Sequence, residues 1–293
     1  MENKRLYFTK MHGIGNDYIY IDATQQVPDD LPNLAKRLSD RHFGIGSDGL
    51  VLIRSTRDAD FFMDMYNQDG SPGLMCGNAI RCVAKYVFER GLTSKKNLVI
   101  DTLSGSKTVE LQLTDHCVSL VSVNMGVPIL DPARIPVRWQ DRRMIDEPIA
   151  LAGKLYPLTC VSMGNPHAVT FVNDIDQLDL PRIGPAFEHH SLFPERVNTE
   201  FVHVIDRQTL RMRVWERGAG ETLACGTGAC AALVAAVLTD RADRRATVRL
   251  SGGDLRIEWD KKTDEVCMTG PAAFVFDGWI DMGQETLHAA SEQ

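Results

Sequence analysis

The 293-residue sequence lacks several patterns that would place it in a large protein class. Its longest strongly apolar run, residues 229–238, is too short for a membrane-spanning helix, which needs about 20 residues. Lysine and arginine do not gather in a stripe and the net charge is −7, so we expect neither nucleic acid nor membrane as a partner. The first residues contain no apolar segment of a secretory signal, which predicts a cytoplasmic protein.

The cysteines do not follow the pattern of a disulfide scaffold or of a redox motif. There are seven, an odd number, and no C-x-x-C occurs. Two pairs, Cys76 with Cys82 and Cys225 with Cys230, raise the alternative of a four-ligand zinc site. Their spacing is wider than in structural zinc pairs, which makes this alternative weak. We expect all cysteines other than Cys76 and Cys225 to be packing residues.

The sequence contains an internal duplication. Short motifs recur in the second half at a nearly constant offset, 149 residues for the first two pairs below and 147 for the third. The pairs are Cys76-Gly77 with Cys225-Gly226, Gly15-Asn16 with Gly164-Asn165, and Leu103-Ser104-Gly105 with Leu250-Ser251-Gly252.

Both halves also repeat one order of predicted elements. A strand (61–66 or 210–215) leads through a glycine-rich turn and a Cys-Gly to a helix (78–90 or 227–239). The second helix is apolar on all sides, as in a fully buried helix. Short strands around one buried helix per half predict an α+β fold. We place the halves at 1–124, with a C-terminal return over 275–293, and at 125–274.

A cysteine just ahead of each helix has a chemical consequence. The free N–H groups and the dipole of a helix N-terminus favour a thiolate, so we expect the pKa of both thiols to be lowered towards neutrality. The same N–H groups can bind a carboxylate. Two opposed thiols can act as base and acid on the two faces of one α-carbon. The pattern therefore predicts an amino-acid racemase or epimerase.

Longer motifs in the sequence resemble those of the diaminopimelate epimerase family, and the resemblance covers almost the whole chain. The motifs are Lys10-Met11-His12-Gly13-Ile14-Gly15-Asn16-Asp17, Met75-Cys76-Gly77-Asn78-Ala79-Ile80-Arg81-Cys82, Met163-Gly164-Asn165-Pro166-His167, Arg196-Val197-Asn198, Trp215-Glu216-Arg217-Gly218-Ala219-Gly220-Glu221-Thr222 and Ala224-Cys225-Gly226-Thr227-Gly228.

The resemblance implies a fold and an activity. The fold would be two pseudo-symmetric halves, each a curled, mostly antiparallel sheet around a central helix. The activity would be the interconversion of LL- and meso-diaminopimelate in lysine biosynthesis, by a cytoplasmic homodimer that uses no metal, pyridoxal phosphate or other cofactor.

The resemblance also implies roles for individual residues. Cys76 and Cys225 would be the acid and base, tuned by His167 and Glu216. Glu216 and Asn16 would also lie near the reacting ammonium. The remaining residues would bind the two ends of the substrate. Gly77, Asn78, Gly226 and Thr227 would hold the reacting carboxylate, and Asn67, Asn165, Asn198 and Arg217 the distal end.

One position departs from part of the family, and three alternatives stay open. Some members carry glutamine where this chain has Gly49, so that side-chain contact is lost. The first alternative is a racemase for another amino acid, such as histidine or proline, which would leave Arg217 buried without a partner. The others are a thiol redox protein using Cys76 and Cys225, and an amino-acid binder without catalysis.

Overall fold

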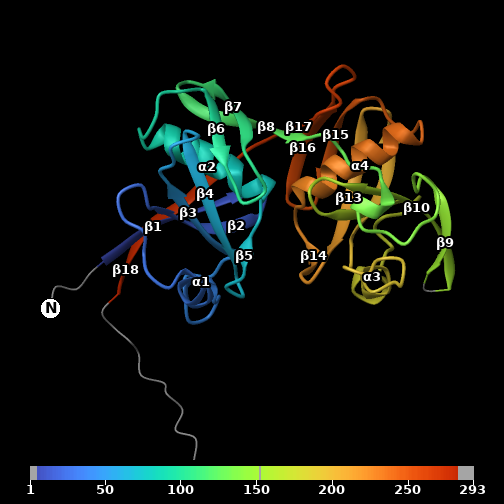
Figure 1. The fold of residues 1–293 in the computed structure, drawn as a ribbon, viewed down its shortest axis with the longest axis horizontal. Coiled ribbons are helices and arrows are strands. Elements are labelled where there is room, and N and C mark those ends of the chain that lie inside the picture. The colour runs from blue at the N-terminus through green and yellow to red at the C-terminus, as the bar shows by residue number, and fades with distance from the viewer. Residues whose placement is uncertain (1–4, 152, 283–293) are drawn as a thin grey trace, which may run out of the picture.

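The computed structural model describes residues 5–151 and 153–282, which form two lobes side by side (Figure 1). The N-terminal lobe contains β1 (Arg5–Gly13), β2 (Asn16–Asp22), α1 (Leu31–Ser39), β3 (Gly49–Arg54), β4 (Phe61–Asn67), β5 (Pro72–Gly73), α2 (Gly77–Glu89), β6 (Asn97–Asp101), β7 (Lys107–Thr114) and β8 (Cys117–Gly126). The C-terminal lobe contains a 3-10 helix (Pro132–Arg134), β9 (Glu147–Leu151), β10 (Lys154–Ser162), β11 (Pro166–Phe171), α3 (Leu180–Glu188), β12 (Asn198–Asp206), β13 (Thr209–Glu216), β14 (Gly220–Thr222), α4 (Gly226–Leu238), β15 (Arg245–Leu250), β16 (Gly253–Trp259) and β17 (Val266–Gly270). The last strand is β18 (Ala273–Asp281).

Strand pairing repeats from one lobe to the other, as the duplicated motifs predict. In the N-terminal lobe β2 pairs parallel with β3, β3 antiparallel with β4, and β4 parallel with β6. In the C-terminal lobe β11, β12, β13 and β15 pair in the same order and with the same directions. The duplication therefore extends to the topology of the sheet, and the predicted α+β class is confirmed.

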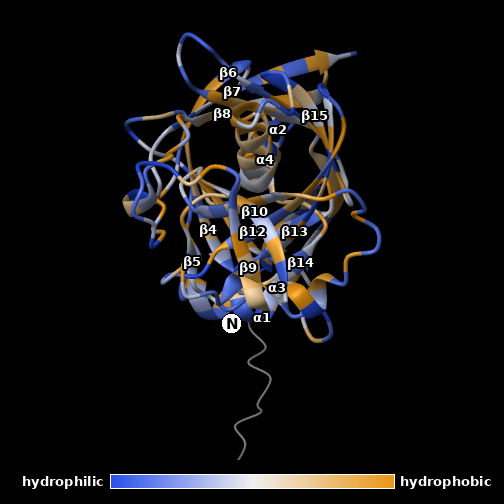
Figure 2. Cartoon of the chain, turned by 90° about the vertical axis from the view of Figure 1, so that its right-hand side faces the viewer, coloured by the Kyte–Doolittle hydropathy of each residue, from blue (hydrophilic) through white to orange (hydrophobic). Residues whose placement is uncertain are grey.

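Each lobe is built around one buried helix. Viewed along the long axis, α2 and α4 lie at the centre with strands around them (Figure 2). Residues 228–236 of α4 are all buried, so the apolar surface that surrounds this helix contacts the sheet on every side. Helix α2 also buries two cations, Arg81 and Lys85. Lys85 is neutralised by Glu89, whose carboxylate lies 2.7 Å from its Nζ.

The predicted helices and strands are confirmed to within a few residues, but one helix per lobe was missed. Helices α1 and α3 lie at corresponding positions at the lower side of the two lobes (Figure 1). Each has nine residues and a proline in its first turn, and α3 contains Pro185 as well. Proline is tolerated in the first turn of a helix but argues against a helix elsewhere, so Pro185 in the interior of α3 hid that element.

The chain returns to its first lobe at the C-terminal end. Strand β18 pairs antiparallel with β1, with Arg5 opposite Asp281. The expected return began at residue 275, within this strand. The rest of that expected segment, residues 283–293, lies outside the described residues. Strands β8 and β17 pair with one another and join the lobes, and Figure 1 shows them between the two helices. The domain boundary at residues 124 and 125 stays a proposal.

Candidate active site

The N-termini of α2 and α4 meet between the lobes. Cys76 and Cys225 are the N-cap residues of these helices, both in extended backbone conformation. The side-chain amide of Asn78, in the first turn of α2, donates to the carbonyl of Ala224, just before α4, at 3.2 Å. The two cysteine-bearing helix ends therefore lie next to each other, as the repeat predicts.

The glycine after each cysteine packs against the same methionine. A Cβ at Gly77 would lie 2.7 Å from Cε of Met268, and a Cβ at Gly226 would lie 3.0 Å from its Sδ. Glycine lets β17, which carries Met268, approach both helix ends closely. The buried guanidinium of Arg81 holds the first turn of α2 in place, because it donates to the Gly77 carbonyl and to Oδ1 of Asn78, both at 2.9 Å.

The Cys76 thiol lies between an amide oxygen and the N–H groups of its helix. Its Sγ is 3.3 Å from Oδ1 of Asn16 and accepts from the N–H of Ala79 at 3.5 Å. Burial raises the pKa of this thiol and is the largest influence on it. The N–H groups of Ala79 and Asn78 oppose that rise, Glu216 adds to it, and Arg81 opposes it.

The Cys225 thiol lies in a more acidic environment. The residue is 5% exposed, and its Sγ is 3.5 Å from Oγ1 of Thr227. Burial raises its pKa well above the ordinary value, and the carboxylates of Glu216 and Glu200 raise it further. The expected lowering of both thiol pKa values towards neutrality is therefore wrong for this form of the protein, because desolvation outweighs the helix N–H groups.

Glu216, at the end of β13, interacts with both thiols. Its carboxylate accepts a hydrogen bond from the hydroxyl of Thr222. Burial raises the pKa of this carboxyl group. Side-chain hydrogen bonds from Thr222 and then from Cys225 lower it in part. The structure thus brings together Cys76, Cys225 and Glu216, and their catalytic roles stay predictions.

His167 lies in the middle of a chain of three hydrogen-bonded side chains, from Glu200 to Asn165. Its Nδ1 lies 2.7 Å from Oε1 of Glu200, and both residues are fully buried. Its Nε2 lies 2.9 Å from Oδ1 of Asn165. Glu200 also approaches the Cys225 helix, since a Cβ at Gly228 would lie 2.7 Å from its Oε1 and 3.2 Å from the Cys225 sulfur. His167 thus connects Asn165 to a carboxylate near Cys225.

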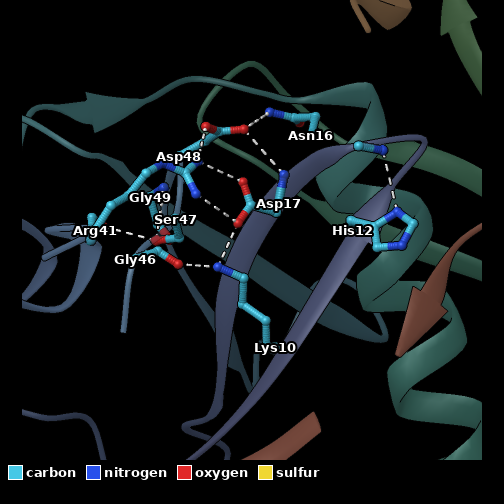
Figure 3. A network of polar contacts seen from close by, with 11 residues as sticks. Lys10, His12, Asn16, Asp17, Arg41, Gly46, Ser47, Asp48 and Gly49 are labelled. Atoms are coloured by element: carbon cyan, nitrogen blue, oxygen red, sulfur yellow. Dashed lines mark hydrogen bonds and ion pairs between the residues drawn. The ribbon is translucent and has the colours of Figure 1, made fainter. Parts of the chain in front are cut away.

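In the N-terminal lobe, Asn16 is held in place by a network of charged side chains (Figure 3). Its amide nitrogen donates to Oδ2 of Asp48 at 2.7 Å. Arg41 contacts both Asp48 and Asp17 at 2.9 Å, and Lys10 forms an ion pair with Asp17 at 2.5 Å. The network lies at the ends of β1 and β2 and in the loop before β3, and it reaches the Cys76 thiol through Asn16.

Of the residues expected to bind the distal end of a substrate, only some are hydrogen-bonded to one another. Asn198 is buried, donates to the Pro166 carbonyl at 3.0 Å and accepts from the backbone N–H of Arg217 at 2.9 Å. Asn67 donates instead to Oγ of Ser71, in the turn before β5. The Arg217 side chain is exposed and donates to the Glu195 carbonyl at 3.0 Å. The expectation that Arg217 is buried is therefore wrong for this form.

Sequence comparison supplies the family. The family model described as diaminopimelate epimerase matches residues 8–130 and 159–275. The chain belongs to the diaminopimelate epimerase family. It is 57% identical to a diaminopimelate epimerase from Acetivibrio thermocellus over 94% of this chain and 99% of that protein. It is 54% identical to one from Methanococcus maripaludis strain S2, with the same coverage.

Solved structures with much lower sequence identity share the fold of this diaminopimelate epimerase family member. A probable proline racemase from Agrobacterium radiobacter K84 superimposes with a TM-score of 0.69 at 14% identity, over 94% of this chain and 93% of that one. A phenazine biosynthesis protein of the PhzF family from Bacillus anthracis gives 0.68 at 15% identity, over 94% and 99%. At such identities the likeness shows the two-lobed fold alone.

The departure at Gly49 has a steric explanation in this member of the diaminopimelate epimerase family. A Cβ at Gly49 would lie 2.2 Å from the carbonyl oxygen of Tyr66 and 2.8 Å from the ring of Tyr18. Glutamine does not fit at this position without a shift of the paired strands β3 and β4. The glycine is therefore part of the local packing.

Three residues of the site were not predicted from the sequence: Arg81, Glu200 and Asp48. Arg81 belongs to the motif that contains Cys76, and Asp48 precedes Gly49, but nothing in their spacing indicates that they lie near a thiol centre. Glu200 carries no clear signal either, because β12 mixes polar and apolar residues and only the structure shows that this carboxylate is buried.

Two further observations concern residues 5–151 and 153–282. No three histidine, cysteine, aspartate or glutamate side chains gather there as a metal ion would need. No helix in these ranges combines the length and apolar character of a membrane span.

Proposed function

We propose that this protein interconverts LL- and meso-diaminopimelate, with Cys76 and Cys225 as base and acid on opposite faces of one α-carbon. The observation that carries the proposal is the meeting of two helix N-termini, each capped by a cysteine. One thiolate would remove the α-proton while the opposite thiol donates a proton, which inverts the centre. The roles would exchange for the reverse reaction.

The helix ends supply what the carbanion needs. Backbone N–H groups of Gly77, Asn78, Gly226 and Thr227 are among the first of their helices, which have no intrahelical partners. Directed at the reacting carboxylate, they would stabilise the negative charge that develops when the α-proton leaves. The proposed reaction needs no electron sink beyond these groups, and we propose that no metal or pyridoxal phosphate takes part.

Polar side chains around the thiols would bind the rest of the substrate. Glu216 is half-buried beside both thiols and suits the reacting ammonium, as does Asn16. We assign the distal end to Asn67, Asn165, Asn198 and Arg217. The exposed Arg217 guanidinium donates through Nη1 to the Glu195 carbonyl, and its other N–H groups make no hydrogen bond within residues 5–151 and 153–282, so donors are available for a distal carboxylate.

The cellular setting follows from the proposed reaction and is proposed with it. Meso-diaminopimelate is a precursor of lysine, so the enzyme would serve lysine biosynthesis in the cytoplasm. We also propose a homodimer, on the family resemblance.

The proposal is tested by proton NMR of LL-diaminopimelate in D2O with chelator-dialysed enzyme and no added cofactor. We expect meso-diaminopimelate to appear with deuterium at the inverted carbon, because the returning proton comes from a thiol that exchanges with solvent. Proline under the same conditions serves as the comparison substrate and should keep its α-proton. Exchange of proline but not of diaminopimelate would assign the site to a different amino acid.

A further inference from the structure

The side-chain amide of Asn16 makes two contacts in opposite directions. Its nitrogen donates to Oδ2 of Asp48 at 2.7 Å, and its oxygen lies 3.3 Å from the sulfur of Cys76. An ionised carboxylate can only accept hydrogen bonds, so Asp48 determines which end of the amide faces the thiol. The oxygen faces Cys76, and the sulfur must then supply the hydrogen.

The Asp48 carboxylate is itself well anchored in its ionised form. Besides the Asn16 amide, its Oδ2 accepts from the backbone N–H of Asp17 at 3.1 Å, and its Oδ1 contacts Nη2 of Arg41 at 2.9 Å (Figure 3). Burial and then the neighbouring Asp17 raise the pKa of Asp48, and these three donors oppose the rise. The carboxylate is therefore a fixed part of the loop before β3.

An acceptor oxygen next to a thiol favours S–H over the thiolate. Other groups around Cys76 act in both directions. The N–H groups of Ala79 and Asn78 and the cation Arg81 favour the thiolate, whereas Glu216 disfavours it. The charge of an ionised Cys76 would raise the pKa values of Tyr18, Tyr20 and Cys82, so these groups are also close to it. Tyr18 in addition shares a side-chain hydrogen bond with Asn16. The Asn16 oxygen is the polar side-chain atom that accepts a hydrogen bond from this thiol, and it acts against the helix N–H groups that donate to it.

We propose that Asp48 is a positioning residue that, by fixing the Asn16 amide with its oxygen towards Cys76, stabilises the protonated form of the Cys76 thiol. This inference rests on the proposed two-thiol function and adds Asp48 to the residues that serve it. At Cys225 the carboxylates of Glu216 and Glu200 disfavour the thiolate. At Cys76 the oriented Asn16 oxygen has the same effect, so either thiol remains available as the acid.

The test is the pH dependence of alkylation of Cys76 in the free enzyme, followed by mass spectrometry of the Cys76 peptide after treatment with iodoacetamide. In Asp48→Asn the amide of Asn16 can turn and donate to the thiolate. We expect the midpoint for Cys76 to fall by about one pH unit, which is about tenfold faster labelling at a fixed pH below it. Asn16→Ala removes the oxygen directly and should produce a similar fall.

Two controls separate amide orientation from simple loss of charge. Asp17→Asn removes a carboxylate from the same network but leaves the Asn16 side-chain contact in place, and should leave the Cys76 midpoint unchanged. In the Asn16→Ala background, Asp48→Asn should add no further shift. An unchanged midpoint in Asn16→Ala, an equal shift in Asp17→Asn, or additive shifts in the double variant would each overturn the proposal. The readout needs no substrate, so its failure is distinguishable from an absence of epimerase activity.

Discussion

The two thiol centres have the same backbone and different chemistry. Each cysteine caps a thirteen-residue helix, precedes a glycine and follows a short strand and turn. Glu216 disfavours the thiolate at both centres. Cys76 also faces an amide oxygen and lies near the cation Arg81, whereas Cys225 also lies near the carboxylate of Glu200. The duplicated scaffold thus fixes where the sulfur atoms lie, and side chains that differ between the lobes determine how readily each one ionises.

The repeat-mate asparagines show this difference most clearly. Asn16 uses its nitrogen to contact Asp48, which leaves its oxygen for the thiol. Asn165 uses its oxygen to contact His167, which leaves its nitrogen as a donor. Equivalent positions therefore present opposite ends of the same amide, so a sequence repeat does not imply a repeated chemical role.

The largest expected effect removes either sulfur. We expect Cys76→Ala and Cys225→Ala each to lower epimerisation at least about 100-fold, because inversion needs both a base and an acid. Steady-state assays with LL- and meso-diaminopimelate measure the loss in both directions. Cys230→Ala, in the same helix as Cys225 but buried in the core, should stay within about threefold of wild type. If either thiol variant kept a tenth of wild-type activity, the assignment of both cysteines as acid and base would be wrong.

A smaller effect concerns the repeat-mate glycines Gly105 and Gly252. A Cβ at Gly252 would lie 1.9 Å from the Ile14 carbonyl oxygen, and backbone atoms cannot move away. Gly105 has open space but a φ of +97°. We expect Gly252→Ala to lower the free energy of unfolding by about 3 kcal/mol and Gly105→Ala by about 1 kcal/mol. Urea denaturation of the two variants measures the difference, and equal losses would mean that the lobes pack more symmetrically than described.

The smallest effect concerns the charge near Cys225. Glu200 raises the pKa of this thiol, so Glu200→Gln should lower it and move the alkylation midpoint of Cys225 to lower pH. We expect labelling at neutral pH to rise threefold to tenfold, while Cys76 is unaffected. Glu188→Gln is the matched control, since Glu188 is also buried in this lobe but contacts Trp215 and Gly218. A shift of the Cys76 midpoint instead would show that the two centres titrate as one.

The sequence predicts the scaffold well because its evidence is local. The apolar run of α4 and the alternating strand 210–215 are set by periodicity, and both are confirmed. The nine-residue helices α1 and α3 were missed because they are stabilised by tertiary burial of residues such as Leu34 and Phe187. The local sequence of such a short helix does not show this burial.

The sequence predicts the candidate site less completely, for a similar reason. Motifs identify Cys76, Cys225, His167 and Glu216, but the partners Asp48 and Glu200 reach the thiol centres from loops and strands that are distant in sequence. Two-fold repetition even suggests a false equivalence between Asn16 and Asn165. Which end of an amide faces a thiol depends on such a distant partner, and spacing carries no information on it.

By itself the sequence determined the duplication, the α+β class, the two helices and the cysteine that caps each of them, since all follow from local order and periodicity. Only the tertiary structure decided that burial raises the pKa of both thiols, against the expectation from helix N-termini. The physical reason is that desolvation depends on everything that surrounds a group, whereas the helix N–H groups belong to its own segment. The opposite orientations of Asn16 and Asn165 were decided in the same way, by residues that only folding brings into contact.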